Sequence, residues 1–544
     1  MSKVGLSKQE FRILLCVCLA QFAVAADNIT TSLLIKDIMV YFQVSISQGQ
    51  IITSSYSVIS APIMIVSGVL GYFFCWKKTF QLGLAMCVVG EFSALFIHDF
   101  YLFIGFSRLL FGIGAALALA ASVALLTTRI EAKNRMFAFS IWATSVAVIT
   151  LLSPMILVLI ASVDWKMSFL FLALIPSIAW LLSLSIKSAT PLETNKKIDP
   201  ISIILIVSIV GLALVGISLL PSLGLFNSDK ASLLDGLSWP SMIFIAVLAL
   251  VIAFFINEKK KSKQACSYLE IIPKSCINIK TIAALYMLLF LYVIYGGVLF
   301  SIVSYMSLGP YSKAQTGIAV TAFALPMCLA SILIASKGKS VSIVKLNIFG
   351  LFILAISLAA LGWSITRTTS FLPLFLGMIS IGIGCGVIAS KSNIAVNNSV
   401  IASLSAQLSG LQVSVRNIGY VIGIAVFSSA LSFLTKNNLI DSYVFANNHL
   451  NLPIEKLDFL STALGFMSNN NLISMLEDHH FLIPANIEVL NNNARAYALQ
   501  IALYASSLMC IISLLVGRMV ANKPKSTAKA AQDPLLSNDL ATVI

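Results

Sequence analysis

The chain has 544 residues, of which 59% are hydrophobic and only 10% carry a charge, well below the roughly 25% charged residues of a soluble domain. This composition excludes an ordinary soluble protein and predicts a polytopic membrane protein. The net charge of +14 does not indicate nucleic-acid binding, because the basic residues lie in short loops between apolar runs and form no basic, aromatic patch.

Apolar runs recur along the chain at the length that a membrane helix needs, about 20 residues. We therefore predict an all-α protein with fourteen transmembrane helices. Six helices form each of two bundles, and the seventh and eighth are inserted between them as a hairpin. Such internal halves are common in transporters, with the substrate site between them. The predicted spans are 11–34, 50–74, 80–97, 101–127, 136–162, 167–186, 200–220, 239–256, 281–306, 316–336, 342–365, 371–389, 402–434 and 494–519.

The same pattern divides the chain into four segments. We expect an N-terminal bundle at 1–186, a linker with the inserted helices at 187–264, a C-terminal bundle at 265–520 and a polar tail at 521–544. The loop 435–493 is far longer than ordinary loops, so we expect it to be functional or disordered and to contain short helices. If the spans alternate, the basic loops share one side of the membrane, which predicts cytoplasmic termini and an extracytoplasmic position for this loop.

Nothing in the sequence indicates a cofactor or a metal. The nine cysteines are scattered without disulfide or metal-ligand spacing. The adjacent His479 and His480 stand in a polar loop, where a solvated pair is the more common state. No G-x-x-x-x-G-K-[ST] motif is present, which argues against an ATP-driven pump. We expect no enzymatic activity.

Charged residues inside predicted spans are the candidate functional residues, since a buried charge in a membrane is costly. Arg108 lies well inside the apolar run 101–127 and shares a helical face with Gly112, where a small residue lets a neighbouring helix approach. Two interpretations stay open for Arg108. It pins helices together through backbone carbonyls, or it stands in a proton or substrate pathway.

Three further charges lie well away from the ends of the predicted spans. Asp27 is a carboxylate that can take up and release a proton, because burial penalises its charged form; the alternative is a polar anchor bonded to nearby hydroxyls. Glu91 is a proton or cation site, or a residue near the outer mouth. Arg416 shares a helical face with Gly419 and Gly423, so it contributes to packing or to substrate contact.

Four stretches, taken together and in this order, resemble the major facilitator superfamily, specifically its fourteen-span drug:proton antiporter branch. Residues 108–116 read RLLFGIGAA and resemble the span-4 motif R-x-x-Q-G-x-G-A-A. Residues 27–34 read DNITTSLL and resemble L-D-x-T-x-x-N-x-A-L in span 1. Residues 165–176 read WKMSFLFLALIP and resemble W-R-W-I-F-x-I-N-x-P, and residues 409–425 resemble the span-13 pattern S-G-L…R-x-x-G-x-x-x-G-x-A.

Two motifs depart from the family pattern. In the loop after span 2, which should read G-x-L-A-D-R-x-G-R-K, the aspartate is Tyr72 and the second glycine is Cys75. In the span-5 antiporter motif G-P-x-x-G-G only Pro154 survives. Gating and antiport are therefore less firmly implied than the fold. The resemblance assigns gating and helix-packing roles to Gly68, Lys77, Gly112, Pro154, Gly419 and Gly423.

The resemblance implies a secondary active transporter that exports small drug-like or amphipathic compounds against protons by alternating access. Its alternative is a proton-coupled carrier for one metabolite or siderophore, which the departures favour. The expected partners are a small-molecule substrate, protons and the lipid bilayer, with a periplasmic adaptor protein as an open alternative. We expect a monomer in the bacterial cytoplasmic (inner) membrane.

Overall fold

The computed structural model describes residues 6–44, 46–131, 164–186, 199–223, 238–261, 279–337, 343–365, 370–397, 402–446, 464–481 and 483–521, with scattered residues between 134 and 160 and residue 460. Within these residues all regular structure is helical, which confirms the all-α class.

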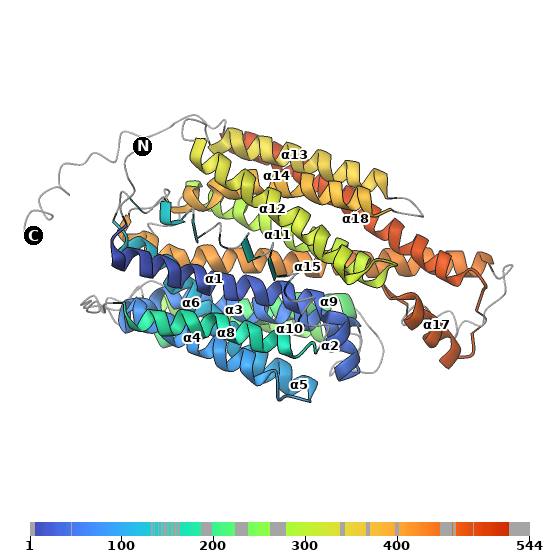
Figure 1. The fold of residues 1–544 in the computed structure, drawn as a ribbon, viewed down its shortest axis with the longest axis horizontal. Helices are drawn as coiled ribbons and strands as arrows, with labels where there is room; N and C mark the ends of the chain where they lie inside the picture. Colours follow the sequence, from blue (N-terminus) through green and yellow to red (C-terminus); the bar gives the residue numbers. More distant parts are fainter. Residues whose placement is uncertain are drawn as a thin grey trace, which may run out of the picture.

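Figure 1 shows the helices as two groups of roughly antiparallel rods. The first group comprises α1 (Lys8–Leu33), α2 (Ile35–Phe42), α3 (Ile46–Phe74), α4 (Trp76–Ser93), α5 (Phe100–Leu102), the π-helical turn η1 (Phe103–Arg108), α6 (Leu109–Arg129), α8 (Met167–Leu184), α9 (Pro200–Leu223) and α10 (Trp239–Lys261). The second comprises α11 (Ile279–Leu308), α12 (Lys313–Lys337), α13 (Ile343–Ser364), α14 (Phe371–Asn397), α15 (Ala402–Ala446), α17 (Asn469–Asp478) and α18 (Ile487–Ala521).

Among the described residues, 11 helical segments are long and apolar enough to cross a membrane. Three of the fourteen predicted spans are not among them. Helix α4 carries charged residues at Lys77, Lys78 and Glu91, and α3 offers only the shorter apolar stretch Ser55–Ser67 among its described side chains. The span predicted at 136–162 lies largely outside the described residues. The count of fourteen and the hairpin insertion therefore stay predictions.

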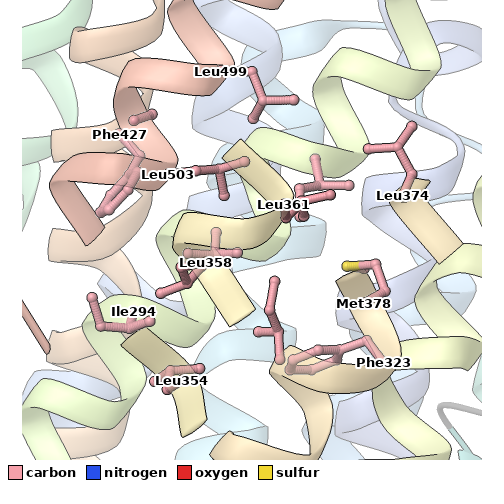
Figure 2. Packing of buried hydrophobic residues seen from close by; sticks show 14 of the residues in the cluster. Ile294, Phe323, Leu354, Leu358, Leu361, Leu374, Met378, Phe427, Leu499 and Leu503 are labelled. Carbon is pink, nitrogen blue, oxygen red and sulfur yellow. The ribbon is translucent and has the colours of Figure 1, made fainter. Parts of the chain in front are cut away.

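Each group of helices has its own hydrophobic core. The core of the second group draws buried side chains from α11, α12, α13, α14, α15 and α18. Figure 2 shows part of it, with Phe323, Leu358 and Met378 contributed by three different helices. The first group buries a separate set of side chains from α1, α3, α4, α6 and α8. Two cores fit the predicted two-bundle architecture.

Helices α3 and α15 join the two groups along a contact that we call the seam. Ser414 Oγ of α15 donates a hydrogen bond to the carbonyl of Ala61 in α3 at 2.7 Å. Asn417 Nδ2 donates to Ser60 Oγ, also at 2.7 Å. These bonds connect residues that are more than 350 positions apart in the chain. Any movement of one bundle against the other would have to change them.

Helix α9 packs against both sides of the seam. Its Leu214 is buried with Ala61 of α3 and Val421 of α15. Helix α10 packs on α9 but leaves apolar side chains such as Leu248 and Phe255 exposed, as a lipid-facing helix does. At the base of this pair, Lys261 forms an ion pair with Asp199, and its Nζ donates to Ser202 Oγ at 2.5 Å.

The helices around the predicted loop 435–493 are longer than the sequence indicated. Helix α15 continues to Ala446 and α18 begins at Ile487, whereas their predicted ends were 434 and 494. The extensions persist because Leu439 and Tyr443 of α15 bury their side chains with Leu472 of α17 in a small core of their own. The polar residues at 435–438 indicated a helix end, whereas packing on α17 continues the helix.

Candidate functional site: a buried charge triad

Asp27, Glu91 and Arg108 come together in one buried site, which we call the charge triad. Arg108 Nη1 donates to Asp27 Oδ1 at 2.6 Å, and Arg108 Nη2 donates to Glu91 Oε2 at 3.2 Å. No side chain of the three is more than 2% exposed. The sequence placed each residue inside a span but did not bring Glu91 to the other two. Arg108 therefore contacts carboxylates, and within the described part of the chain it donates no hydrogen bond to a backbone carbonyl.

The local backbone geometry around Arg108 places its side chain in the triad. The six residues Phe103–Arg108 form a π-helical turn, a local feature that recurs at functional sites. Ser107 Oγ donates to the carbonyl of Gly90 at 2.8 Å, which fixes this turn against α4. A Cβ at Gly90 would lie 2.7 Å from the backbone nitrogen of Phe111, so only glycine permits this approach beside Glu91.

Aromatic rings enclose the guanidinium. The Cζ atom of Arg108 lies 5.2 Å from the ring centroids of Phe103 and Phe169 and 5.4 Å from that of Phe111. All three rings are at most 1% exposed. Cation–π attraction adds to the two ion pairs, and the rings keep bulk water from the triad, which strengthens every charge interaction inside it. The sequence gives no signal for these phenylalanines, because phenylalanine is common in any apolar span.

The two carboxylates of the triad are not equivalent. Asp27 makes the shorter ion pair, and Thr31 Oγ1 lies 3.3 Å from its Oδ1. Glu91 makes the longer ion pair, and its Oε1 has no hydrogen-bond partner among the described residues. With both carboxylates ionised, the triad has a formal charge of −1 without a counter-charge, which is costly in a low dielectric. One bound proton removes that charge, so the triad can act as a proton site.

Arg416, the fourth predicted charge, lies elsewhere. It belongs to α15 in the second group, and its Cζ stacks 4.8 Å from the ring centroid of Tyr292 in α11. Its neighbours on the same helix bring the two helices together. A Cβ at Gly419 would lie 2.6 Å from the carbonyl oxygen of Leu289, and one at Gly423 would clash with the carbonyl of Val293.

The remaining predicted residues lie apart from the triad. A Cβ at Gly112 would lie 2.8 Å from Ile59, so Gly112 lets α6 approach α3. Lys77 Nζ donates to the carbonyl of Leu184 at the end of α8, at 3.3 Å. Gly68 lies within helix α3, and Pro154 falls outside the described residues. These contacts fit packing roles, and the gating roles stay predictions.

The departure at Cys75 has a local consequence. This residue has φ = 69°, a region that favours glycine and costs other residues roughly 1–2 kcal/mol. The chain therefore keeps the turn that the motif glycine would form but makes it with a less suitable residue.

No group of three or more His, Cys, Asp or Glu side chains in the described part of the chain could hold a metal ion.

Comparison with known proteins extends these observations. The human organic anion transporter MFSD10 (TETRAN) is similar in structure, with a TM-score of 0.56 at 13% identity over 93% of this chain and 98% of that one. The xylose transporter XylE from E. coli, in a partially occluded inward-open conformation, gives 0.58 at 10% identity, covering 96% and 100%. A POT family transporter in complex with 5-aminolevulinic acid gives 0.58 at 14% identity, covering 96% and 98%.

At these identities the likeness shows the fold alone. A search of curated protein sequences found no match. The family model for the Major Facilitator Superfamily, in contrast, matches residues 17–428, well over half of the chain. The chain therefore belongs to the major facilitator superfamily and is a multi-pass membrane transporter, not an enzyme.

Proposed function

We propose that this protein is a proton-coupled secondary transporter that moves small organic molecules by alternating access. The observation that carries the proposal is the charge triad, in which one guanidinium serves two buried carboxylates. A purely structural ion pair needs one carboxylate. The second carboxylate gives the site a proton to bind and release, and buried ionisable groups inside membranes commonly mark such relays.

In this proposal Glu91 carries the proton and Asp27 is the fixed counter-ion of Arg108. The unpartnered Oε1 of Glu91 supports this division, because a neutral carboxyl tolerates a missing partner better than a charged one. Release of the proton leaves the triad with an excess negative charge. That charge changes the preferred packing of α1, α4 and η1, which supply the three side chains.

The proton gradient is sufficient for the task. Movement of one charge across 100 mV is worth about 2.3 kcal/mol, which supports a concentration ratio of roughly 40-fold, since each tenfold ratio requires about 1.4 kcal/mol. Larger ratios need the chemical gradient of protons as well.

For the substrate we keep two candidates. The resemblance to the drug:proton antiporter branch favours export of drug-like or amphipathic compounds from the bacterial cytoplasm across the inner membrane. The altered motif residues Tyr72 and Cys75 favour a carrier for one metabolite or siderophore. The similar structures are named as transporters of organic anions and xylose, so their fold is compatible with either candidate.

The test is transport by the purified protein in proteoliposomes with a pH gradient imposed in either direction. The probes are carboxyfluorescein, ethidium and a neutral dye. We expect at least one probe to accumulate only with the gradient and to stop when a protonophore is added. Glu91→Gln abolishes this accumulation, whereas the matched exposed control Glu488→Gln retains it. Accumulation that is unaffected by the protonophore, or by Glu91→Gln in well-folded protein, would contradict the proposal.

A further inference from the structure

Arg416 lacks the partners that a half-buried arginine normally has. It forms no ion pair or hydrogen bond with any residue that the structure describes, and its one recorded contact is the ring of Tyr292. The guanidinium has five N–H donors. Donors that stay unused where they are shielded from water are costly, and a bound anion would satisfy them.

The position of Arg416 on α15 directs it toward the space between the two groups of helices. Gly419 and Gly423 mark the side of α15 that packs on α11. Ser414 and Asn417 mark the side that packs on α3 at the seam. At 100° per residue, Arg416 lies about 20° from Gly423 and about 100° from Asn417, so it stands at the edge of the α11 side that is nearer the seam. It lies where the halves of a transporter meet and where substrates bind near mid-membrane, and its side chain remains partly exposed.

A series of neighbouring aromatic rings begins at Tyr292, on which Arg416 stacks. The ring of Tyr292 lies 5.7 Å from that of Tyr295, which in turn lies 6.0 Å from Tyr420 and 5.4 Å from Phe323. Tyrosine rings offer flat apolar surface together with a hydroxyl group. Such a cluster suits an aromatic molecule more than a sugar, whose many hydroxyl groups need many polar partners.

We propose that Arg416, with Tyr292 and Tyr420, binds the anionic group and the adjoining ring of an aromatic organic anion, which is the substrate of the transporter. A planar guanidinium matches the two oxygens of a carboxylate or sulfonate, and the tyrosine rings pack on the apolar body. The statement that this anion is the substrate rests on the proposed transport function. The binding site itself does not depend on proton coupling.

A stacked pair of rings adjoins the charge triad and lies within electrostatic reach of this anion site. Phe111, which faces Arg108, stacks on Tyr56 of α3 with 5.7 Å between the ring centroids. Tyr56 lies within electrostatic reach of both Asp27 and Arg416. An anion bound at Arg416 therefore changes the electrostatic environment of Tyr56, whose ring contacts the triad through Phe111.

The test measures binding to the purified full-length protein in detergent, without any gradient. Four aromatic anions serve as probes: benzoate, naphthalenesulfonate, phenyl phosphate and carboxyfluorescein. The aromatic cation ethidium serves for comparison. We expect saturable binding of at least one anion, weakened at least tenfold by Arg416→Gln and restored in part by Arg416→Lys. Lys436→Gln, which removes a cation elsewhere on α15, leaves the affinity unchanged.

Three results would overturn the anion site. One is that none of the four anions binds the wild-type protein. Another is that a well-folded Arg416→Gln variant binds them as the wild type does. The third is that ethidium binds as tightly as the anions and equally well to the wild type and the variant. The failures of the two proposals are distinguishable. Arg416-dependent anion binding without gradient-driven accumulation contradicts proton coupling alone, and gradient-driven accumulation of ethidium alone contradicts the anion site.

Discussion

The two groups of helices each hold an arginine inside the membrane region, and the two residues are treated in opposite ways. Arg108 is 1% exposed, forms ion pairs with two carboxylates and is enclosed by three phenylalanines. Arg416 keeps partial exposure, has no ion-pair partner in the described part of the chain and stacks on one tyrosine. Arg108 has two carboxylates for its single positive charge, whereas Arg416 has no carboxylate partner among the described residues.

The contrast between Arg108 and Arg416 indicates two functions for an arginine whose burial is costly. An arginine with its own carboxylates stabilises its surroundings and, when the carboxylates outnumber it, creates a place for a proton. An arginine without a carboxylate is available to an anion that enters from outside. The proposed coupled transport uses both functions, and Tyr56, which stacks on Phe111 beside the triad, lies within electrostatic reach of Arg416.

The largest effect is expected from Arg108→Gln. It leaves two buried carboxylates without their cation, and breaking a buried ion pair in this way costs about 3–5 kcal/mol. Denaturation of the purified variant in detergent measures the loss of stability. Combining it with Asp27→Asn and Glu91→Gln should recover part of it, because no buried charge then remains. Equal stability of Arg108→Gln and wild type would remove the contrast between the arginines.

A smaller effect is expected from Gly90→Ala. The new Cβ would approach the backbone of Phe111 to 2.7 Å, so α4 and α6 must separate, at a cost of roughly 1–3 kcal/mol for overpacking. The separation lengthens the pair between Arg108 and Glu91 and impairs proton-coupled transport. Gly105→Ala in the adjacent π-helical turn is the matched control, because a Cβ there meets nothing within 4 Å. Similar results for the two variants would contradict the packing argument.

Asp199 offers a paired charge at the edge of the membrane for comparison. Burial raises the pKa of this carboxyl, but hydrogen bonds from Lys261 and Ser202 outweigh that effect and lower its pKa to about 2 from the ordinary 3.8. Because the folded-state pKa is lower, the pair stabilises the protein above about pH 4 and loses this contribution as the pH falls toward 2.

The thermal stabilities of wild type and Asp199→Asn should therefore differ most near neutral pH and converge in acid. The measurement is the melting temperature of both proteins as a function of pH. A difference that is independent of pH would show that the aspartate acts by packing alone. Asp199 could then not serve as a paired charge to compare with the triad.

The smallest effect on stability is expected from Arg416→Gln. Because no described carboxylate depends on Arg416, its removal leaves no buried charge unpaired, and we expect a change within about 0.5 kcal/mol. The same denaturation assay that detects the Arg108→Gln effect serves here. A loss as large as that of Arg108→Gln would identify Arg416 as a structural residue and would weaken the proposed anion site.

Much of this architecture could be predicted from the sequence, because apolar runs and isolated charges are local signals. The all-α class, the membrane helices and the individual positions of Asp27, Glu91 and Arg108 are of this kind. Their assembly was not predictable in full. The contact between Glu91 and Arg108 depends on a π-helical turn and on the close approach that Gly90 permits, and neither has a clear local signature.

The ends of α15 and α18 that flank residues 447–486 show the same limit. Helix α15 was predicted to end at 434, since polar residues follow, yet Leu439 and Tyr443 continue the helix by packing against α17. Similarly, Arg416 was given packing and substrate roles as equal alternatives. The structure shows that the glycines pack on α11 and that Arg416, on the same face, stacks on Tyr292 of that helix.

The central claim is that the triad holds one proton, on Glu91, at neutral pH. Infrared difference spectroscopy of wild type against Glu91→Gln measures this directly, through the C=O stretch of a protonated carboxyl group. We predict a protonated-carboxyl band in the wild type at pH 7 that is absent in Glu91→Gln, whereas Glu488→Gln leaves it unchanged. Absence of such a band in the wild type, or its persistence in Glu91→Gln, would contradict the account.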